Sequence, residues 1–237
     1  MQGIKALTFD TGGTILDWHT GIGRALAAAG GRHGLERDWP AIANDYRARS
    51  LKAMVNTGAD GPATYNIDDV HRRMLGEVIG EYDLGVFTDS DREAIWRAWH
   101  ELDCWPDFPA SLAKLREKFV VASFTILSVS LIVDTARRNG LSWDAVISCE
   151  MIGKYKILPE AYLQAAKWLA LQPGEILMVA CHNVDLNAAR DVGFKSAFVR
   201  RPDEWGAAGP PDPTPSPHHN IIADDFPDLA QQLGLEV

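Results

Sequence analysis

The sequence predicts an α/β fold: a Rossmann-like parallel sheet core that carries an inserted helical cap domain. The apolar run at residues 4–9 ends at Asp10 and a Gly-rich turn, as expected of a buried strand that leaves the sheet. Residues 18–102 carry successive helical patterns and almost no strand signal. After residue 105, helices and strands alternate, which is typical of a parallel sheet with helices on its faces.

The elements follow from these patterns in chain order. After the first strand, apolar residues at three- and four-residue spacing predict cap helices at 21–33, 40–54, 68–79 and 90–102. The core continues with helices at 110–118, 129–139, 159–169 and 185–192, which alternate with strands at 119–124, 145–148, 176–180 and 196–199. We therefore predict a core of residues 1–17 and 103–237 and a cap of residues 18–102. Five prolines between residues 210 and 217 predict an extended surface loop.

Composition and net charge argue against several classes of binding partner. The 237 residues carry a net charge of −9, and lysines and arginines form no run longer than a pair, so we expect no nucleic acid and no membrane as partner. Three separated cysteines indicate reduced thiols, and no signal-peptide layout or membrane span is visible, so we expect a cytoplasmic protein. The sequence leaves a homodimer open.

Polar residues follow several of the predicted strands. Asp10 follows the first strand, Thr125 the second, Lys156 lies beyond the third, and residues 182–185 follow the fourth. Ligands of open parallel sheets bind at the carboxyl ends of the strands. These side chains therefore predict a binding or catalytic site at one edge of the sheet.

The same residues form a recognisable set of motifs. The segment Phe9-Asp10-Thr11-Gly12-Gly13-Thr14, followed by Thr125, Lys156 and Asp185 in that order, resembles the four signature motifs of the haloacid dehalogenase superfamily. Further features, listed here together, are similar to type II 2-haloacid dehalogenases and their defluorinating subgroup: Trp18, Tyr46-Arg47, Trp99-His100, Trp105-Pro106-Asp107 and Arg201-Pro202-Asp203-Glu204. The resemblance covers nearly the whole chain.

The resemblance implies a metal-independent hydrolase that acts on a small anionic substrate, with a 2-haloacid favoured. Asp10 would be the nucleophile that forms an ester intermediate. Thr14 and Thr125 would hold its carboxylate, Lys156 would keep it ionised, and Asp185 would activate or orient the hydrolytic water. Further residues are implied to bind substrate or halide: Thr11, Gly12, Arg47, Ile126, Tyr162, His182 and Asn183. Arg47 would receive the halide, and His182 would donate to fluoride or position water.

Two absences argue against phosphatase chemistry. Superfamily phosphatases carry a second aspartate where this chain has Gly12, and a metal-binding carboxylate near Ala180 and Cys181. Mg²⁺ prefers oxygen ligands in octahedral geometry, so we expect no metal and no other cofactor. We read the neighbouring His218 and His219 as solvated loop residues.

Other features depart from the dehalogenase pattern. Ile126 stands where the family commonly has a halide-binding asparagine, Gly12 replaces a bulky residue, and Lys156-Ile157 replaces a Lys-Pro pair. These departures keep two alternatives open. One is a hydrolase that opens a strained C–N ring by the same aspartyl attack, and the other is a catalytically degenerate metabolite- or protein-binding relative.

Overall fold

A computed structural model describes residues 3–58 and 66–236 of the chain, except for the side chains of 55–58. Its sheet is parallel throughout, with the order β3-β2-β1-β4-β5-β6. The strands are β1 Ala6–Phe9, β2 Val120–Thr125, β3 Ala145–Ser148, β4 Ile176–Ala180, β5 Lys195–Val199 and β6 Ile221–Ala223. The predicted α/β class is confirmed.

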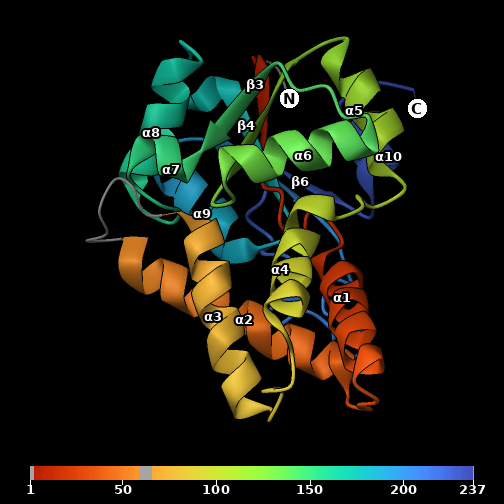
Figure 1. The fold of residues 1–237 in the computed structure, drawn as a ribbon. Helices are drawn as coiled ribbons and strands as arrows, with labels where there is room; N and C mark the ends of the chain where they lie inside the picture. The colour runs from red at the N-terminus through yellow and green to blue at the C-terminus, as the bar shows by residue number, and fades with distance from the viewer. Residues whose placement is uncertain (1–2, 59–65, 237) are drawn as a thin grey trace.

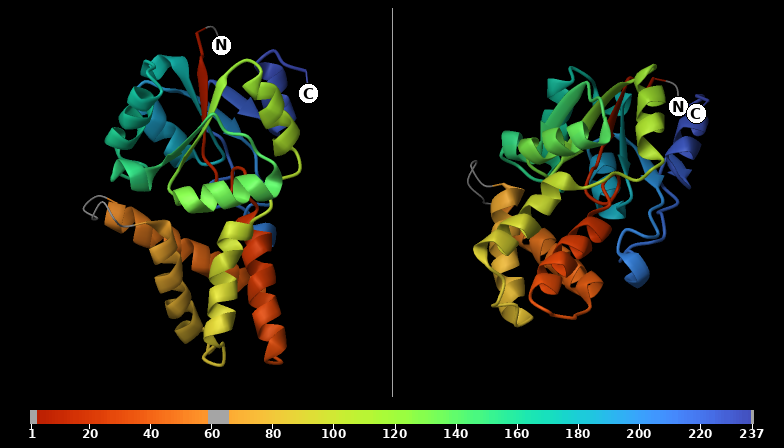
Figure 2. Two further views of the ribbon diagram at one scale, coloured as in Figure 1. Left: turned by 45° about the horizontal axis from the view of Figure 1, so that its top comes forward. Right: turned by 45° about the vertical axis from the view of Figure 1, so that its right-hand side comes forward.

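Helices cover the sheet and form the inserted part. The insert contains α1 Trp18–Arg32, α2 Trp39–Gly58, α3 Ile67–Glu81, α4 Asp89–Arg97 and the 3-10 turn η1 Ala98–Glu101. The core contains α5 Phe108–Arg116, α6 Val129–Asn139, α7 Cys149–Ile152, α8 Pro159–Trp168, α9 Asn183–Asp191 and α10 Phe226–Gln232, with 3-10 turns η2 Pro173–Glu175 and η3 Gly206–Ala208. Figures 1 and 2 show α1–α4 grouped below the α/β core. The boundaries at 17/18 and 102/103 stay a prediction.

The central position of β1 determines where a ligand can bind. β1 pairs with β2 on one side and with β4 on the other, so the chain changes direction across the sheet at this strand. The backbone N–H of Asp10 continues the ladder by donating to the carbonyl of Val179 at 2.9 Å. A crevice at the carboxyl end of such a switch point is the usual ligand site of open α/β sheets. Asp10 therefore lies at the middle of the sheet edge where a ligand is expected to bind.

An aromatic cluster fills the interior of the cap. The Tyr46 hydroxyl donates to the carbonyl of His71 at 2.8 Å and accepts from Trp99 Nε1 at 3.2 Å. The His71 ring stacks on Trp99 with centroids 3.9 Å apart. Trp18, at the start of α1, is fully buried, and this helix begins there because the Asp17 side chain accepts the N–H of Thr20. The ring nitrogen of Trp18 donates to Glu204 Oε1 at 3.2 Å, so this side chain contacts the core.

A histidine bridges cap and core. His100 Nδ1 lies 2.9 Å from Asp134 Oδ2 on α6, and His100 Nε2 lies 3.4 Å from Asp68 Oδ1 on α3. Burial alone would lower the pKa of His100, but these two carboxylates outweigh it and raise the pKa above its usual value. The imidazole therefore connects two carboxylates across the boundary, and both favour its charged form.

The predicted elements differ from the observed ones mainly at the C-terminus. β6 and α10 extend the core after the proline-rich loop, where the sequence analysis predicted no further element. A strand of three residues carries too little alternation to be recognised by pattern. α10 has clearer signals that the prediction overlooked, because Asp225 accepts the N–H of Asp228 as an N-cap and a proline occupies its first turn.

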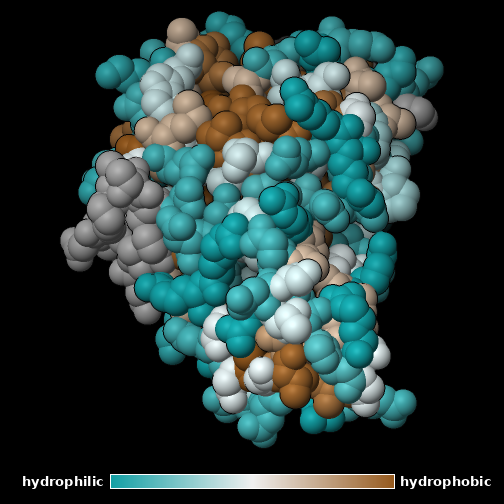
Figure 3. All heavy atoms as spheres, in the orientation of Figure 1, coloured by the Kyte–Doolittle hydropathy of each residue, from teal (hydrophilic) through white to brown (hydrophobic). Residues whose placement is uncertain are grey.

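The molecular surface agrees with the charged composition. Figure 3 shows a mostly hydrophilic face, with apolar patches near the top of the core and near the lower end of the cap. Among the described helices, none combines the length and the apolar character needed to cross a bilayer.

Candidate active site

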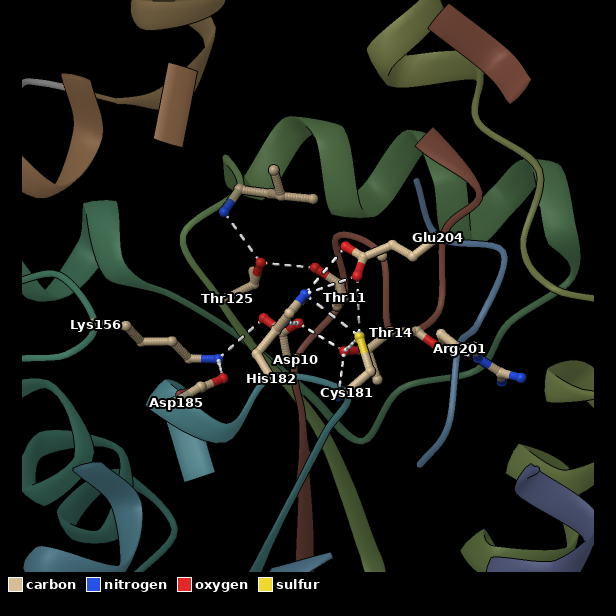
Figure 4. A network of polar contacts seen from close by, with 12 residues as sticks. Asp10, Thr11, Thr14, Thr125, Lys156, Cys181, His182, Asp185, Arg201 and Glu204 are labelled. Carbon is tan, nitrogen blue, oxygen red and sulfur yellow. Dashed lines mark hydrogen bonds and ion pairs between the residues drawn. The ribbon is translucent and has the colours of Figure 1, made fainter. Parts of the chain in front are cut away.

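Asp10 is held by donors at both carboxylate oxygens. Its side chain is buried at the end of β1. Oδ2 accepts from Thr14 Oγ1 at 2.8 Å and lies 3.3 Å from His182 Nδ1. Oδ1 has a longer contact, 3.2 Å from Lys156 Nζ. Figure 4 shows these side chains converging on Asp10. The expected contacts of Thr14 and Lys156 with Asp10 are therefore present, and Oδ1 is the less encumbered oxygen.

Lys156 lies between two carboxylates. Besides its contact with Asp10, its Nζ donates to Asp185 Oδ2 at 2.7 Å. The other oxygen of Asp185 accepts from the Tyr162 hydroxyl at 2.6 Å. Tyr162 thus contacts Asp185 and positions it. The neighbouring Lys154 is exposed, so Lys156 is the lysine that serves this site.

The environment gives the two carboxylates different pKa values. Burial alone would raise the pKa of Asp10, but Lys156 and His182 outweigh it and hold this pKa well below its usual value. For Asp185, burial dominates over the attraction of Lys156 and raises the pKa. Burial also works against the charge of Lys156, yet Asp185 and Asp10 outweigh it and raise the lysine pKa. Asp10 is therefore the anion and Asp185 the more basic carboxylate, a division of roles typical of acid–base sites.

A buried glutamate holds His182. Nε2 of His182 lies 3.0 and 3.2 Å from the two carboxylate oxygens of Glu204, which lies in the loop after β5. Glu204 is buried, and its Oε1 accepts from Trp18 Nε1 at 3.2 Å. Burial alone would lower the pKa of His182, but neighbouring Cys181 and Glu204 and the contact with Asp10 outweigh it and hold the pKa well above its usual value. A ring with a carboxylate at each nitrogen donates to both only in its charged form.

Arg47 brings a buried guanidinium from the cap to the loop that carries Asp10. The residue is 3% exposed, and its Nε and Nη1 atoms have no hydrogen-bond partner within residues 3–58 and 66–236. Its guanidinium carbon lies 5.7 Å from the ring centroid of Trp18 and 5.6 Å from that of Trp99. A Cβ atom added at Gly12 would lie 2.8 Å from Arg47 Nη2. The guanidinium therefore points at the loop that carries Asp10.

Gly13 makes room for Glu204 in the same way. Gly13 has φ +92°, a conformation that glycine adopts readily. A Cβ atom there would overlap the carboxylate of Glu204. Arg201 then fixes the loop from behind, since its Nε donates to the Thr14 carbonyl at 3.0 Å and its Nη2 contacts both carboxylate oxygens of Asp107. Gly12 thus leaves room for Arg47, and Gly13 leaves room for Glu204.

Thr125 differs from its prediction. Its hydroxyl lies 2.6 Å from the hydroxyl of Thr11 and accepts the N–H of Leu127 at 3.0 Å, so it bonds these two groups and not the Asp10 carboxylate. The Thr125 hydroxyl has a single proton to donate. The backbone N–H of Leu127, in the loop after β2, donates to a lone pair of this hydroxyl. Thr125 therefore connects the β1 and β2 loops. The partly buried Ile126 packs against the hydrophobic core and offers an apolar wall without a donor.

Asn183 also has a different place from the expected one. Its Nδ2 donates to the Thr214 carbonyl, and its Oδ1 contacts the N–H of Ser216 and Nε2 of His219, each at 2.8 Å. These bonds hold the proline-rich loop against Asn183, and they use one of the two N–H donors of its amide. His219 is buried, with its other nitrogen 3.1 Å from Ser196 Oγ, so reading it as solvated was wrong; His218 is exposed.

The residues do not fit the Mg²⁺ ion that the phosphatase pattern requires. Gly12 has no side-chain oxygen, and Ala180 and Cys181 supply no carboxylate. The Lys156 ammonium lies between Asp10 and Asp185, where its positive charge would repel a cation. Both the available ligand atoms and the local positive charge therefore argue against Mg²⁺ at this site.

Two neighbours of the nucleophile were not assigned by sequence. Glu204 lies 22 positions after His182, and no spacing rule connects an acidic loop residue to a histidine at the end of another strand. Cys181 was considered only as a missing carboxylate, although its Sγ lies 3.3 Å from His182 Nε2. The one sequence signal was the Arg-Pro-Asp-Glu segment that contains Glu204, which pointed to the family and not to a role.

Comparisons with known proteins identify the family. The model of the haloacid dehalogenase-like hydrolases matches residues 4–193. The crystal structure of a defluorinating L-2-haloacid dehalogenase is 36% identical, with a TM-score of 0.91, and covers 98% of this chain and 95% of that one. A second L-2-haloacid dehalogenase structure is 32% identical, with a TM-score of 0.90, and covers 98% and 99%.

A curated relative gives the same family. The (S)-2-haloacid dehalogenase of Xanthobacter autotrophicus is 27% identical over 203 residues, which are 84% of this chain and 76% of that protein. The resemblance predicted from the sequence motifs is thereby confirmed. The chain belongs to the haloacid dehalogenase-like hydrolase family.

Proposed function

We propose that this chain hydrolyses small (S)-2-haloacids to 2-hydroxy acids through an ester formed on Asp10. One observation carries the proposal: the anionic Asp10 follows a strand near Gly12, and the vacant side-chain position of Gly12 faces the buried guanidinium of Arg47, whose Nε and Nη1 have no hydrogen-bond partner among the described residues. A nucleophile and an anion receptor therefore meet at one loop. Relatives at 32% and 36% identity are named L-2-haloacid dehalogenases, which supports the same activity.

The first step forms the ester. Oδ1 of Asp10 attacks the halogen-bearing carbon of the substrate, the carbon–halogen bond breaks, and the halide leaves with its electron pair. The leaving group departs opposite the attacking oxygen. His182 contacts Oδ2 of Asp10 and Glu204, on the nucleophile's own side. We therefore assign Arg47, not His182, to receive the halide.

The second step hydrolyses the ester. Oδ2 becomes the carbonyl oxygen of the ester, and Thr14 and His182, which contact it, form an oxyanion hole when water attacks the Asp10 Cγ. Asp185, with its raised pKa, takes the proton from that water. Lys156, 3.2 Å from Oδ1, donates a proton to the departing alkoxide and regains one through its contact with Asp185. The overall reaction consumes water and releases the hydroxy acid, the halide and one proton.

A substrate panel tests the proposal. Halide release is measured with both enantiomers of 2-chloropropionate, with chloroacetate and with fluoroacetate, always in the presence of EDTA. We expect release from the S enantiomer with inversion at the reacting carbon, and from fluoroacetate, as for the relative named defluorinating. Release of ring-opened product from a cyclic amino acid, with no halide from any haloacid, would favour the ring-opening alternative.

Isotope labelling tests the ester itself. In a single turnover in ¹⁸O-water, we expect the label in Asp10 and not in the product, because the product oxygen comes from the carboxylate. Asp10→Asn should retain the fold and lose turnover. Full labelling of the first product would show direct attack by water. The homodimer and the cytoplasmic location stay predictions.

A further inference from the structure

We propose that Cys181, His182 and Glu204 form a binding site for a thiophilic divalent cation such as Zn²⁺, and that its occupancy inhibits the enzyme. In the described part of the chain, this is the one group of at least three histidine, cysteine or acidic side chains whose ligand atoms converge, all within 4.8 Å of one another. Figure 4 shows the sulfur, the imidazole and the carboxylate pointing toward one another. The binding site is independent of the proposed function, whereas the inhibition rests on it.

The spacing of the three ligand atoms fits a tetrahedral ion. Zn–S bonds of about 2.3 Å and Zn–N and Zn–O bonds of about 2.0–2.2 Å place neighbouring ligand atoms about 3.3–3.6 Å apart around a tetrahedral centre. The observed separations are 3.3 Å from Cys181 Sγ to His182 Nε2, 3.6 Å from Sγ to Glu204 Oε2, and 3.0 and 3.2 Å from Nε2 to the Glu204 oxygens. Shifts of a few tenths of an ångström complete the geometry.

The backbone holds these ligands in position without a metal. Cys181 and His182 are consecutive residues at the end of β4, and the N–H of Cys181 donates to Thr14 Oγ1 at 3.1 Å. Glu204 is fixed from the other side by Trp18 Nε1 and by the close approach of Gly13. A site assembled in advance loses little conformational entropy when the ion binds.

The donor set selects the metal. A thiolate, a carboxylate and a neutral imidazole together balance the charge of a divalent ion, so the buried unit is neutral; the thiol proton of Cys181 and the Nε2 proton of His182 both go to solvent. Thiolate and imidazole ligands favour Zn²⁺ and related ions, whereas Mg²⁺ requires oxygen ligands. The site is therefore chemically distinct from the Mg²⁺ site of phosphatases, and a fourth ligand would come from water.

Occupancy would disable the second step. A metal on His182 Nε2 replaces the contact of that nitrogen with Glu204 and shifts the ring whose Nδ1 lies 3.3 Å from Asp10 Oδ2. The oxyanion hole then keeps Thr14 as its undisturbed side-chain donor. Hydrolysis of the ester should slow while ester formation continues.

Cobalt absorption tests the site without any substrate. Co²⁺ added to the purified, reduced protein should give a thiolate-to-cobalt charge-transfer band in the near ultraviolet and visible bands of a tetrahedral ion, and Zn²⁺ should abolish both. Cys181→Ala should remove the charge-transfer band and weaken Zn²⁺ affinity at least about tenfold, since loss of an outer partner alone costs about 10–100-fold. Cys149→Ala, which removes another buried thiol, is the matched control and should retain the band.

Activity provides the second readout. Zn²⁺ should inhibit halide release by the wild type reversibly, with recovery on EDTA, and Mg²⁺ should have no effect. Each variant is compared with its own metal-free rate and checked for folding by its melting temperature; Cys181→Ser is used if the alanine variant does not fold. Equal Co²⁺ spectra for wild type and Cys181→Ala would overturn the site. Binding at this site without inhibition would overturn the inhibitory role alone, and binding in a protein inactive on every haloacid would separate the site from the proposed function.

Discussion

Arg47 reaches the space that a side chain at position 12 would fill: a Cβ atom on Gly12 would lie 2.8 Å from Nη2 of Arg47. At this position the chain thus lacks the carboxylate that phosphatases carry, and the Arg47 guanidinium of the cap lies in the adjacent space instead. The same glycine leaves room for the guanidinium to which we assign the halide. The loss of the carboxylate and the approach of Arg47 therefore both depend on the single residue Gly12.

Gly12→Ala should lower kcat/KM and weaken inhibition by the product halide. The added methyl group forces the guanidinium away, and Trp18 and Trp99 limit where it can move. Steady-state kinetics with chloride as inhibitor measure the effect. Gly23→Ala is the control, because a Cβ there meets nothing within 4 Å. An unchanged inhibition constant for chloride in Gly12→Ala would contradict the assignment.

Arg47→Ala should reduce kcat about 10²–10³-fold, the usual cost of losing a donor that stabilises developing charge. Arg47→Lys should recover part of the rate, since an ammonium supplies charge without the planar fork. Arg49→Ala, in the same helix but paired with Asp45 near the surface, should change little. Rates are compared at saturating substrate. A near-normal kcat in Arg47→Ala would move the halide site elsewhere.

Lys156→Met should shift the acid limb of the kcat/KM profile to higher pH. Lys156 lowers the pKa of Asp10 against the effect of burial, so its removal lets burial raise that pKa and protonate the nucleophile at a higher pH. The pH profile of halide release measures the shift. Lys154→Met, beside it but exposed, should leave the profile in place. An acid limb that stays put in Lys156→Met would show that another group controls Asp10.

Glu204→Gln should slow the steady state about 10²-fold, the lower end of the cost of losing an oxyanion-hole donor, while the first halide is still released. The amide no longer holds His182 by charge, so the oxyanion hole weakens and the Asp10 ester accumulates. Rapid-mix halide assays and intact-protein mass spectrometry detect the burst and the ester. Asp203→Asn, at the exposed neighbouring position, is the control. Equal loss of burst and steady state would place Glu204 in the first step instead.

His100 should stabilise the fold at low pH and lose this effect as the pH rises. Its pKa is raised in the folded state, so the stabilisation is complete below the unfolded pKa of about 6.5 and disappears as the pH passes the folded pKa. His100→Gln should therefore melt a few degrees below wild type at pH about 5.5, with the gap closing by pH about 9. His218→Gln, at an exposed histidine, should show no such gap. A gap that widens with pH would reverse the sign.

Much of the core and the nucleophile loop was predictable from sequence because these features are local. The apolar run before Asp10 and the Gly-Gly turn determine a strand and a loop without reference to the rest of the chain. The order of the motifs then located Lys156 and Asp185. His182, which contacts Asp10 from the end of β4, and Arg47, which reaches the Asp10 loop from the cap, needed the family resemblance to be singled out.

The remainder depends on contacts between distant segments. Thr125 bonds Thr11 because two loops meet in space, and Asn183 binds the proline-rich loop 31 residues away. Glu204, in the loop after β5, contacts His182, which follows β4. Side chains of this kind have no periodicity, and their roles follow from tertiary geometry alone.

The central place of β1 in the sheet has a consequence for synthesis. The strand that carries the nucleophile is made first, yet its sheet neighbours begin at residues 120 and 176. During translation the growing chain therefore holds an apolar segment with two unpaired edges, next to a carboxylate whose lysine and histidine partners come more than 140 residues later. The nascent protein cannot bury Asp10 as an anion until nearly the whole core has left the ribosome. The charged surroundings of Asp10 and the folded sheet thus depend on the same later residues.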